Sequence, residues 1–178
     1  TGVPIESFGE GGKRNLQKDL DYDKEEFFIV SNTPGVIYKD KIIMGMRLSE
    51  GLDAAPGHVR AFNVKTGARD WIFHTIPQPG EVGYETWEKD SYKNVGAANN
   101  WAGMTLDEKR GIVYVPTGTA SYDFWGGFRH GQNLYANNIL ALDANTGKRI
   151  WNFQAVHHDV WDRDFPSNPT LATITKDG

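Results

Sequence analysis

One sequence pattern occurs twice in this chain, and it limits the folds that the chain can adopt. Residues 61–73 read AFNVKTGARDWIF and residues 141–153 read ALDANTGKRIWNF, with the same residue at six aligned positions. In each copy the glycine supplies the positive φ of a tight hairpin turn, and the next strand carries Trp and Phe on one face. Such self-similarity is typical of a propeller or another repeat array, with two unrelated hairpins as the alternative.

Each copy of the repeat ends a set of expected strands. The first set comprises Gly35–Tyr38, Lys41–Met46, 58–63 and 69–74. The second set comprises 101–106, 112–116, 138–143 and 149–154. Four short strands joined by turns match one propeller blade, so we expect an all-β fold with antiparallel blades at about residues 33–74 and 100–154. Val, Ile and Trp side chains, among them Trp71 and Trp151, should be buried between neighbouring blades.

Long loops and the two ends of the sequence complete this picture. Residues 75–99 and 118–137 interrupt the strand pattern, and loops of that length usually carry function. Thr1-Gly2 matches the turn of the repeat, and 171–175 has the composition of a strand that would begin a further blade at about 169–178. No strand follows to pair with it, so we expect a piece of a longer protein.

The composition excludes several kinds of site and partner. The 178 residues include no cysteine, which rules out disulfides and thiolate metal sites. The formal net charge is -4 and no basic block stands out, so nucleic acid and anionic membranes are not expected as partners. No apolar run approaches the ~20 residues of a membrane span, and no signal-peptide pattern opens the sequence.

Carboxylates and aromatic side chains concentrate in VHHDVWDRD, residues 156–164, directly after the outermost strand of the second blade. Chain that leaves this strand must return toward the propeller axis, where propellers place ligands. Asp162 and Asp164 are two residues apart and would point the same way on an extended chain. A pair of carboxylates can hold a hard cation such as Ca²⁺. From this stretch alone, a solvated acidic loop with Arg163 neutralising one carboxylate remains the favoured alternative.

Two motifs carry a family resemblance. NNWAGM, residues 99–104, and HHDVWDRDFPSNPTL, residues 157–171, resemble the quinoprotein dehydrogenases, which use pyrroloquinoline quinone (PQQ) and a divalent cation. The glucose-dehydrogenase type is the most similar. The resemblance runs over essentially all of the chain and implies an eight-bladed propeller of four-stranded blades, of which about two blades plus flanks are present here. It also implies a bacterial periplasmic location, with membrane association of the full-length protein left open.

The resemblance assigns roles to three residues in particular. Asp162, which follows a tryptophan in the HD-x-W-D pattern, corresponds to the catalytic base beside the metal. Trp101 corresponds to the floor on which the quinone ring stacks, and a flat indole suits a planar cofactor. Glu50, in GMRLSEG, corresponds to a cation ligand, with Asp53 as the fallback because the loop length differs.

Further residues correspond to the surroundings of the cofactor. Arg47 is expected to contact a cofactor carboxylate, and Ser31 and Thr33 are candidate hydrogen-bond donors to the cofactor. Thr119 stands where the family often has an asparagine that binds the metal, so direct coordination by its hydroxyl is in question. Asp164 is an additional acid beside the metal, and in some relatives an acid there accompanies lanthanide use.

The implied activity is oxidation of a sugar or alcohol by PQQ and Ca²⁺, with electrons passed to a respiratory acceptor such as a quinone or cytochrome. Asp162 would take the hydroxyl proton, and this fragment alone is expected to be inactive. Two alternatives stay open: a non-catalytic repeat propeller that acts as a binding or assembly scaffold, and a glycosidase with a carboxylate pair. Each residue also has a structural alternative: Trp101 as a blade-core residue, Glu50 as a surface acid, and Arg47 as a partner of Glu50 or Asp53.

Overall fold

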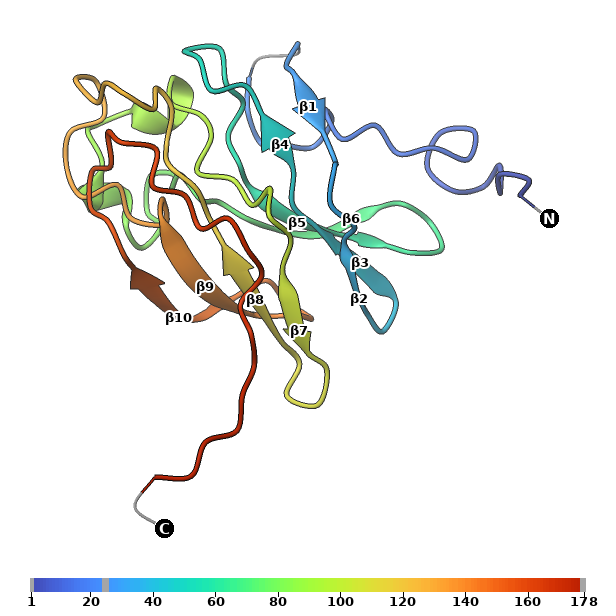
Figure 1. Cartoon of the computed structure of the whole chain (residues 1–178). Helices are drawn as coiled ribbons and strands as arrows, with labels where there is room; N and C mark the ends of the chain where they lie inside the picture. The colour runs from blue at the N-terminus through green and yellow to red at the C-terminus, as the bar shows by residue number, and fades with distance from the viewer. Residues whose placement is uncertain (1, 24–25, 177–178) are drawn as a thin grey trace.

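The structure is a computed structural model that describes residues 2–23 and 26–176. Two four-stranded antiparallel sheets lie side by side, with a two-stranded ribbon above the first (Figure 1). The first sheet has the order β2-β3-β5-β6, with β2 at Val36–Tyr38, β3 at Lys41–Met44, β5 at Val59–Asn63 and β6 at Arg69–Phe73. The second has the order β10-β9-β8-β7, with β7 at Thr105–Asp107, β8 at Ile112–Pro116, β9 at Asn138–Asp143 and β10 at Arg149–Gln154.

Shorter elements complete the chain. The ribbon pairs β1, Ile29–Val30, with β4, Arg47–Leu48. The loop between the sheets holds two 3-10 turns, η1 at Tyr84–Thr86 and η2 at Ser91–Lys93. No helix in the described part of the chain is long or apolar enough to cross a bilayer.

The expected strands are confirmed with three exceptions. β3 ends at Met44 rather than at Met46, whose N–H donates to Asn100 O at 2.7 Å outside the ladder. β7 begins at Thr105 rather than at 101. The Asn100 side chain takes the place of the strand ladder there, because its Nδ2 donates to Gly103 O at 2.6 Å and to Pro116 O at 2.8 Å. The strand expected at 171–175 was wrong, since these residues join no ladder. No neighbouring strand among the described residues offers them hydrogen-bond partners. Lys176 is likewise without strand structure, and 177–178 lie outside the described residues.

The two sheets share one apolar core. Ile43, Val59, Ala61 and Trp71 from the first sheet pack with Val113, Val115, Leu140 and Leu142 from the second. The strand alternation that the sequence showed thus buries one face of each sheet against the other. The exception is Trp151, which was expected to be buried and is 43% exposed, because no further sheet covers β10 among the described residues.

Each Thr-Gly turn receives a ring from the preceding part of the chain. Trp71 donates from its indole N–H to Ala144 O at 3.3 Å and lies flat against Gly147, where an added Cβ would be 2.5 Å from the ring. Gly67 has a looser contact: an added Cβ would lie 3.1 Å from Gly9 N and 3.3 Å from the Phe8 ring. The glycines of the repeat therefore serve both the turn, with φ of 72° at each, and the docking of a ring.

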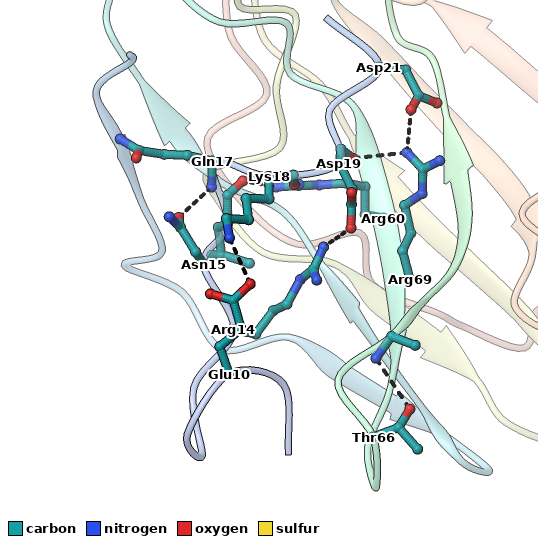
Figure 2. Close-up of polar contacts among 12 residues, drawn as sticks. Glu10, Arg14, Asn15, Gln17, Lys18, Asp19, Asp21, Arg60, Thr66 and Arg69 are labelled. Carbon is teal, nitrogen blue, oxygen red and sulfur yellow. Dashed lines mark hydrogen bonds and ion pairs between the residues drawn. The ribbon is translucent and has the colours of Figure 1, made fainter. Parts of the chain in front are cut away.

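The N-terminal segment is fastened to the first sheet by two arginines (Figure 2). Arg60 on β5 is fully buried and donates to Leu16 O and Lys18 O, both at 2.8 Å. Arg69 on β6 donates to the Asp21 carboxylate at 2.7 Å. Burial lowers the pKa of Arg60 to about 10, which leaves its guanidinium charged at neutral pH. A buried, charged donor that binds two carbonyls of this segment explains why a segment without regular strands holds its place.

We predict that Gly147→Ala destabilises the full-length protein by about 3 kcal/mol or more, because a methyl group would add a clash with Trp71 to the cost of positive φ. Gly80→Ala is the matched control: Gly80 has φ of +90° but nothing within 4 Å, so it should lose only about 1 kcal/mol. Urea unfolding of both variants measures the difference. Equal losses would show that Trp71 does not depend on this close approach.

Candidate functional site

The two-stranded ribbon and loops of the second sheet enclose one cavity of about 480 Å³. The ribbon contributes β4 and the segment after it, and the second sheet contributes the segments before β7, after β8 and after β10. The lining residues are Arg47, Leu48, Ser49, Glu50, Ala97, Asn99, Trp101, Thr119, Asp123, Asp162, Arg163, Asp164 and Pro166. Residues that are far apart in the sequence therefore face one hollow.

Backbone contacts bring β4 next to the start of the second sheet. Met46 donates its N–H to Asn100 O at 2.7 Å, and Asn99 Nδ2 donates to Met46 O at 2.7 Å. Gly45 allows this approach, since an added Cβ would lie 2.3 Å from Asn100 O. Arg47 and Glu50 consequently reach the same cavity as Trp101.

The connection after β10 crosses the whole second sheet, as expected for a chain that returns toward the axis. It reaches β7, where Thr105 donates its hydroxyl to Pro169 O at 2.5 Å. On the way it bends around Asp159, which is buried and accepts hydrogen bonds from the N–H groups of Trp161 and Arg163 at 3.0 and 2.6 Å. Asp162 has φ of 54°, so the chain is not extended there. The extended chain expected at Asp162 is therefore wrong, although Asp162 and Asp164 both line the cavity.

The insertion between β8 and β9 forms another wall. Arg129 is fully buried and ties this insertion together: it donates to Asn133 Oδ1 at 2.7 Å, to Tyr122 O at 3.2 Å and to Asp159 O at 2.6 Å. The last bond joins the insertion to the connection after β10. Asp123 is thereby carried into the cavity wall, where its residue is only 4% exposed.

Asp164 and Thr119 make specific contacts at the floor. Asp164 accepts hydrogen bonds from Trp101 Nε1 and from the Thr119 backbone N–H, both at 2.6 Å. The Thr119 hydroxyl donates to Asp159 Oδ2 at 2.7 Å. Both oxygens of Asp164 and the hydroxyl of Thr119 are thus engaged by protein groups.

The cavity concentrates negative charge. Partial desolvation and then the carboxylates of Asp164 and Glu50 raise the pKa of Asp162, although the residue itself remains exposed. Burial, followed by the charges of Asp162 and Glu50, raises the pKa of Asp123 to about 7. Burial also acts to raise the pKa of Asp159, but its hydrogen bonds outweigh that effect and hold this pKa below its usual value. Asp159 is a structural anion, whereas Asp123 and Asp162 face the cavity.

The structure brings together most of the residues that the sequence singled out. Arg47, Glu50, Trp101, Thr119, Asp162 and Asp164 all line the cavity. Arg47 lies over the Phe28 ring at 5.7 Å and, within the described residues, forms no ion pair with Glu50 or Asp53. Arg163 forms no ion pair with any acid among the described residues. The alternative of a solvated acidic loop, in which Arg163 neutralises one carboxylate, therefore finds no support.

Three predicted residues lie outside the cavity. Ser31 donates its hydroxyl to Thr33 O, and Thr33 donates its own to Trp101 O, both at 3.2 Å. Thr33 therefore supports the backbone of Trp101 rather than lining the site. Asp53, the fallback for Glu50, accepts a hydrogen bond from Ser49 at 2.8 Å.

Sequence reasoning missed Asp123. It sits in SYDFWGG, a stretch of aromatic residues and glycines in which it is the single charged residue. The length of the insertion indicated function, but no spacing linked this carboxylate to Asp162. Only the fold brings the two together.

The donor atoms of the cavity suit a hard cation. Carboxylate oxygens are the ligands that Ca²⁺ prefers. Burial and the charges of Asp162 and Glu50 raise the pKa of Asp123, so a cation in the cavity would relieve their repulsion. Among the described residues, however, no group of three or more histidine, aspartate or glutamate side chains is close enough to hold an ion. Ca²⁺ takes six to eight oxygens, so the protein carboxylates here fit as part of a ligand set that a bound cofactor and water would complete.

Comparison with known proteins identifies the fold and its family. All of residues 1–178 match the family described as PQQ: glucose/ethanol/alcohol dehydrogenase, β-propeller domain. The chain belongs to this family. Among solved structures, the quinohemoprotein alcohol dehydrogenase from Comamonas testosteroni aligns with this family member at a TM-score of 0.68 and 29% identity, over 80% of this chain and 23% of that one.

Curated relatives are similar over nearly the whole chain. Quinoprotein glucose dehydrogenase A of Acinetobacter calcoaceticus is 36% identical over 182 residues, covering 98% of this chain and 22% of that protein. Quinate/shikimate dehydrogenase (quinone) of Acinetobacter baylyi is 36% identical over 183 residues, covering 100% and 22%. This member of the PQQ family thus spans about a fifth of the length of these relatives.

The raised pKa of Asp123 predicts a pH-dependent stability. Its pKa of about 7, against the ordinary 3.8, means that the folded state binds this proton more tightly than the unfolded chain does. Its contribution to stability is therefore lost as pH rises from about 4 to about 7. In full-length protein free of PQQ and divalent cations, Asp123→Asn should gain stability relative to wild type across this range.

Chemical denaturation at a series of pH values measures this difference. Asp107→Asn is the control, because Arg110 lowers the pKa of Asp107 and its stability difference should stay flat above about pH 5. A constant difference between Asp123→Asn and wild type over the same range would contradict the prediction.

Proposed function

We propose that the protein is a PQQ-dependent dehydrogenase of the glucose-dehydrogenase type that oxidises a hydroxyl group of a sugar or alcohol. The observation that carries the proposal is the convergence of Glu50, Trp101 and Asp162 on one cavity of a family propeller. A scaffold built of the same repeats needs the Thr-Gly turns and the docked rings but has no need for this convergence.

The residues of the cavity divide the chemistry between them. PQQ, when bound, supplies the oxidant and accepts the hydride that leaves the substrate carbon. Trp101 offers a flat, partly buried ring for a planar cofactor. Arg47 provides a guanidinium suited to a cofactor carboxylate. Asp162 accepts the proton of the substrate hydroxyl, so that a carbonyl compound or lactone is formed.

We propose Ca²⁺ as the cation, held by Glu50 and Asp162. A cation there would keep Asp162 ionised by opposing the desolvation and the carboxylate repulsion that raise its pKa. Thr119 contributes at most its remaining oxygen lone pair, because its hydroxyl proton is directed to Asp159. Asp164, which the sequence also suggested as a ligand, has both oxygens engaged by the protein.

The wider assignments rest on the resemblance alone. The chain is proposed as part of an eight-bladed propeller, with blades at about 33–74 and 100–154 and a further blade from about 169–178. A respiratory quinone or cytochrome is the proposed electron acceptor, and the names of the quinate/shikimate and quinohemoprotein relatives favour this class. A periplasmic location stays a prediction.

Asp162→Asn tests the proposed base in the full-length protein. Asparagine tolerates the left-handed backbone at this position and keeps one oxygen for a cation, so PQQ binding should weaken only modestly. Turnover should fall by about 100-fold or more, the usual loss for a positioned base. Dye-linked glucose oxidation with PQQ titrated at saturating Ca²⁺ measures both, and Glu108→Gln, an exposed acid of the β7–β8 hairpin, is the charge control. If Asp162→Asn turns over at the wild-type rate at saturating PQQ, Asp162 is not the base.

Trp101→Ala should behave in the opposite way. Loss of the ring removes a stacking surface, so the affinity for PQQ should fall by about tenfold or more, and saturating PQQ should restore part of the rate. Trp125→Ala is the matched control, since Trp125 is 55% exposed on the insertion and lies outside the cavity lining. The same titration decides the matter: equal PQQ affinity in both variants would exclude Trp101 from cofactor binding.

A further inference from the structure

The floor of the cavity has an unusual polar support. Trp101 has a single side-chain donor, its indole N–H, and this donor lies 2.6 Å from Asp164 Oδ2. The other oxygen of the same carboxylate accepts the Thr119 N–H, also at 2.6 Å. A charged acceptor makes both hydrogen bonds stronger than neutral ones. Rotation of the indole would therefore break a strong bond and leave a carboxylate oxygen without its partner.

The backbone around Thr119 is shaped to receive this carboxylate. Gly118 has no side chain, and an added Cβ would lie 2.5 Å and 2.6 Å from the two oxygens of Asp164. The Thr119 hydroxyl and the Asn137 amide both bind Asp159, at 2.7 and 3.2 Å, which fixes the segment from its other side. Asp164 thus joins a rigid loop to the indole ring.

The backbone of Trp101 is held independently of its ring. Thr33 donates to the Trp101 carbonyl at 3.2 Å, and the buried Asn100 side chain bridges two nearby carbonyls. These contacts act on the backbone, whereas the hydrogen bond to Asp164 acts on the ring.

We propose that Asp164 is a positioning residue, which fixes the plane of the Trp101 indole so that a planar cofactor meets a preformed surface. Asp164 acts through Trp101 and not as a cation ligand. This proposal rests on the proposed function, in which Trp101 stacks on PQQ. A preformed surface raises affinity because the ordering cost of the ring is met before the cofactor binds.

A double-mutant cycle in the full-length protein tests the proposal. Asp164→Asn keeps the shape but can accept only one of the two hydrogen bonds and presents an amide N–H₂ to the other donor. Trp101→Phe keeps an aromatic ring and removes the donor. PQQ affinity is measured for the wild type, both single variants and the double variant at saturating Ca²⁺, and Ca²⁺ affinity is measured at saturating PQQ.

We expect Asp164→Asn to weaken PQQ binding by about tenfold when Trp101 is present. In the Trp101→Phe background the same substitution should weaken binding by less than about twofold. Ca²⁺ affinity should change by less than about twofold. Gly118→Ala supplies a second variant that retains the charge of Asp164 but pushes the carboxylate away, and it should show the same dependence on Trp101. Gly118 does not have a positive φ, so alanine is compatible with its backbone.

Two results would overturn the proposal. An effect of Asp164→Asn that is equally large in the Trp101→Phe background would show that Asp164 does not act through the indole. A large loss of Ca²⁺ affinity, with PQQ affinity restored by excess Ca²⁺, would make Asp164 a cation ligand. Failure of the proposed function looks different: Trp101→Ala would then bind PQQ like the wild type, whatever Asp164 does.

Discussion

The contact between Trp71 and the turn at Gly147 determines how the two sheets meet. The indole packs against a glycine and donates to Ala144 O, so the two sheets are joined by both a close packing contact and a hydrogen bond. The Glu50 segment is held beside Trp101 by a second close approach, that of Gly45 to Asn100 O. Two glycines therefore fix the architecture, one between the sheets and one at the candidate site.

Carboxylates of the cavity region differ in what surrounds them. Asp159 accepts hydrogen bonds from two backbone N–H groups and two side chains, which stabilise its charge and order the loop. Asp123 and Asp162 have little such support, and desolvation followed by the charges of neighbouring carboxylates raises the pKa of each. Hydrogen bonds to Asp159 thus order the loop that carries Asp162, whereas the carboxylates of Asp162 and Asp123 have few hydrogen bonds of their own and could bind a cation.

Local pattern predicted the strands well because each is a short, regular element bounded by its own turn: β8, β9 and β10 have the expected limits. The start of β7 could not be predicted, since a side chain, Asn100, replaces the ladder there. The convergence of Glu50 with Asp162 came from resemblance, not from spacing. Asp123 and the bond between Asp164 and Trp101 depend on tertiary contacts across more than 35 residues, which no local pattern encodes.

The insertion between β8 and β9 has a consequence for how such a protein can diversify. β8 and β9 pair with each other in direct register from Ile112 to Pro116, so the ladder is complete without the residues that join its ends. Arg129 ties the middle of the insertion to Asp159 O, and the insertion also binds the loop between the sheets, where Ser121 N–H donates to Gly96 O at 3.1 Å and Asn133 N–H donates to Thr86 O at 3.0 Å. Changes within the insertion that keep these contacts would reshape one wall of the cavity while the ladder of the blade remains intact. Selection could thus vary this wall only within the limits that the neighbouring loop imposes.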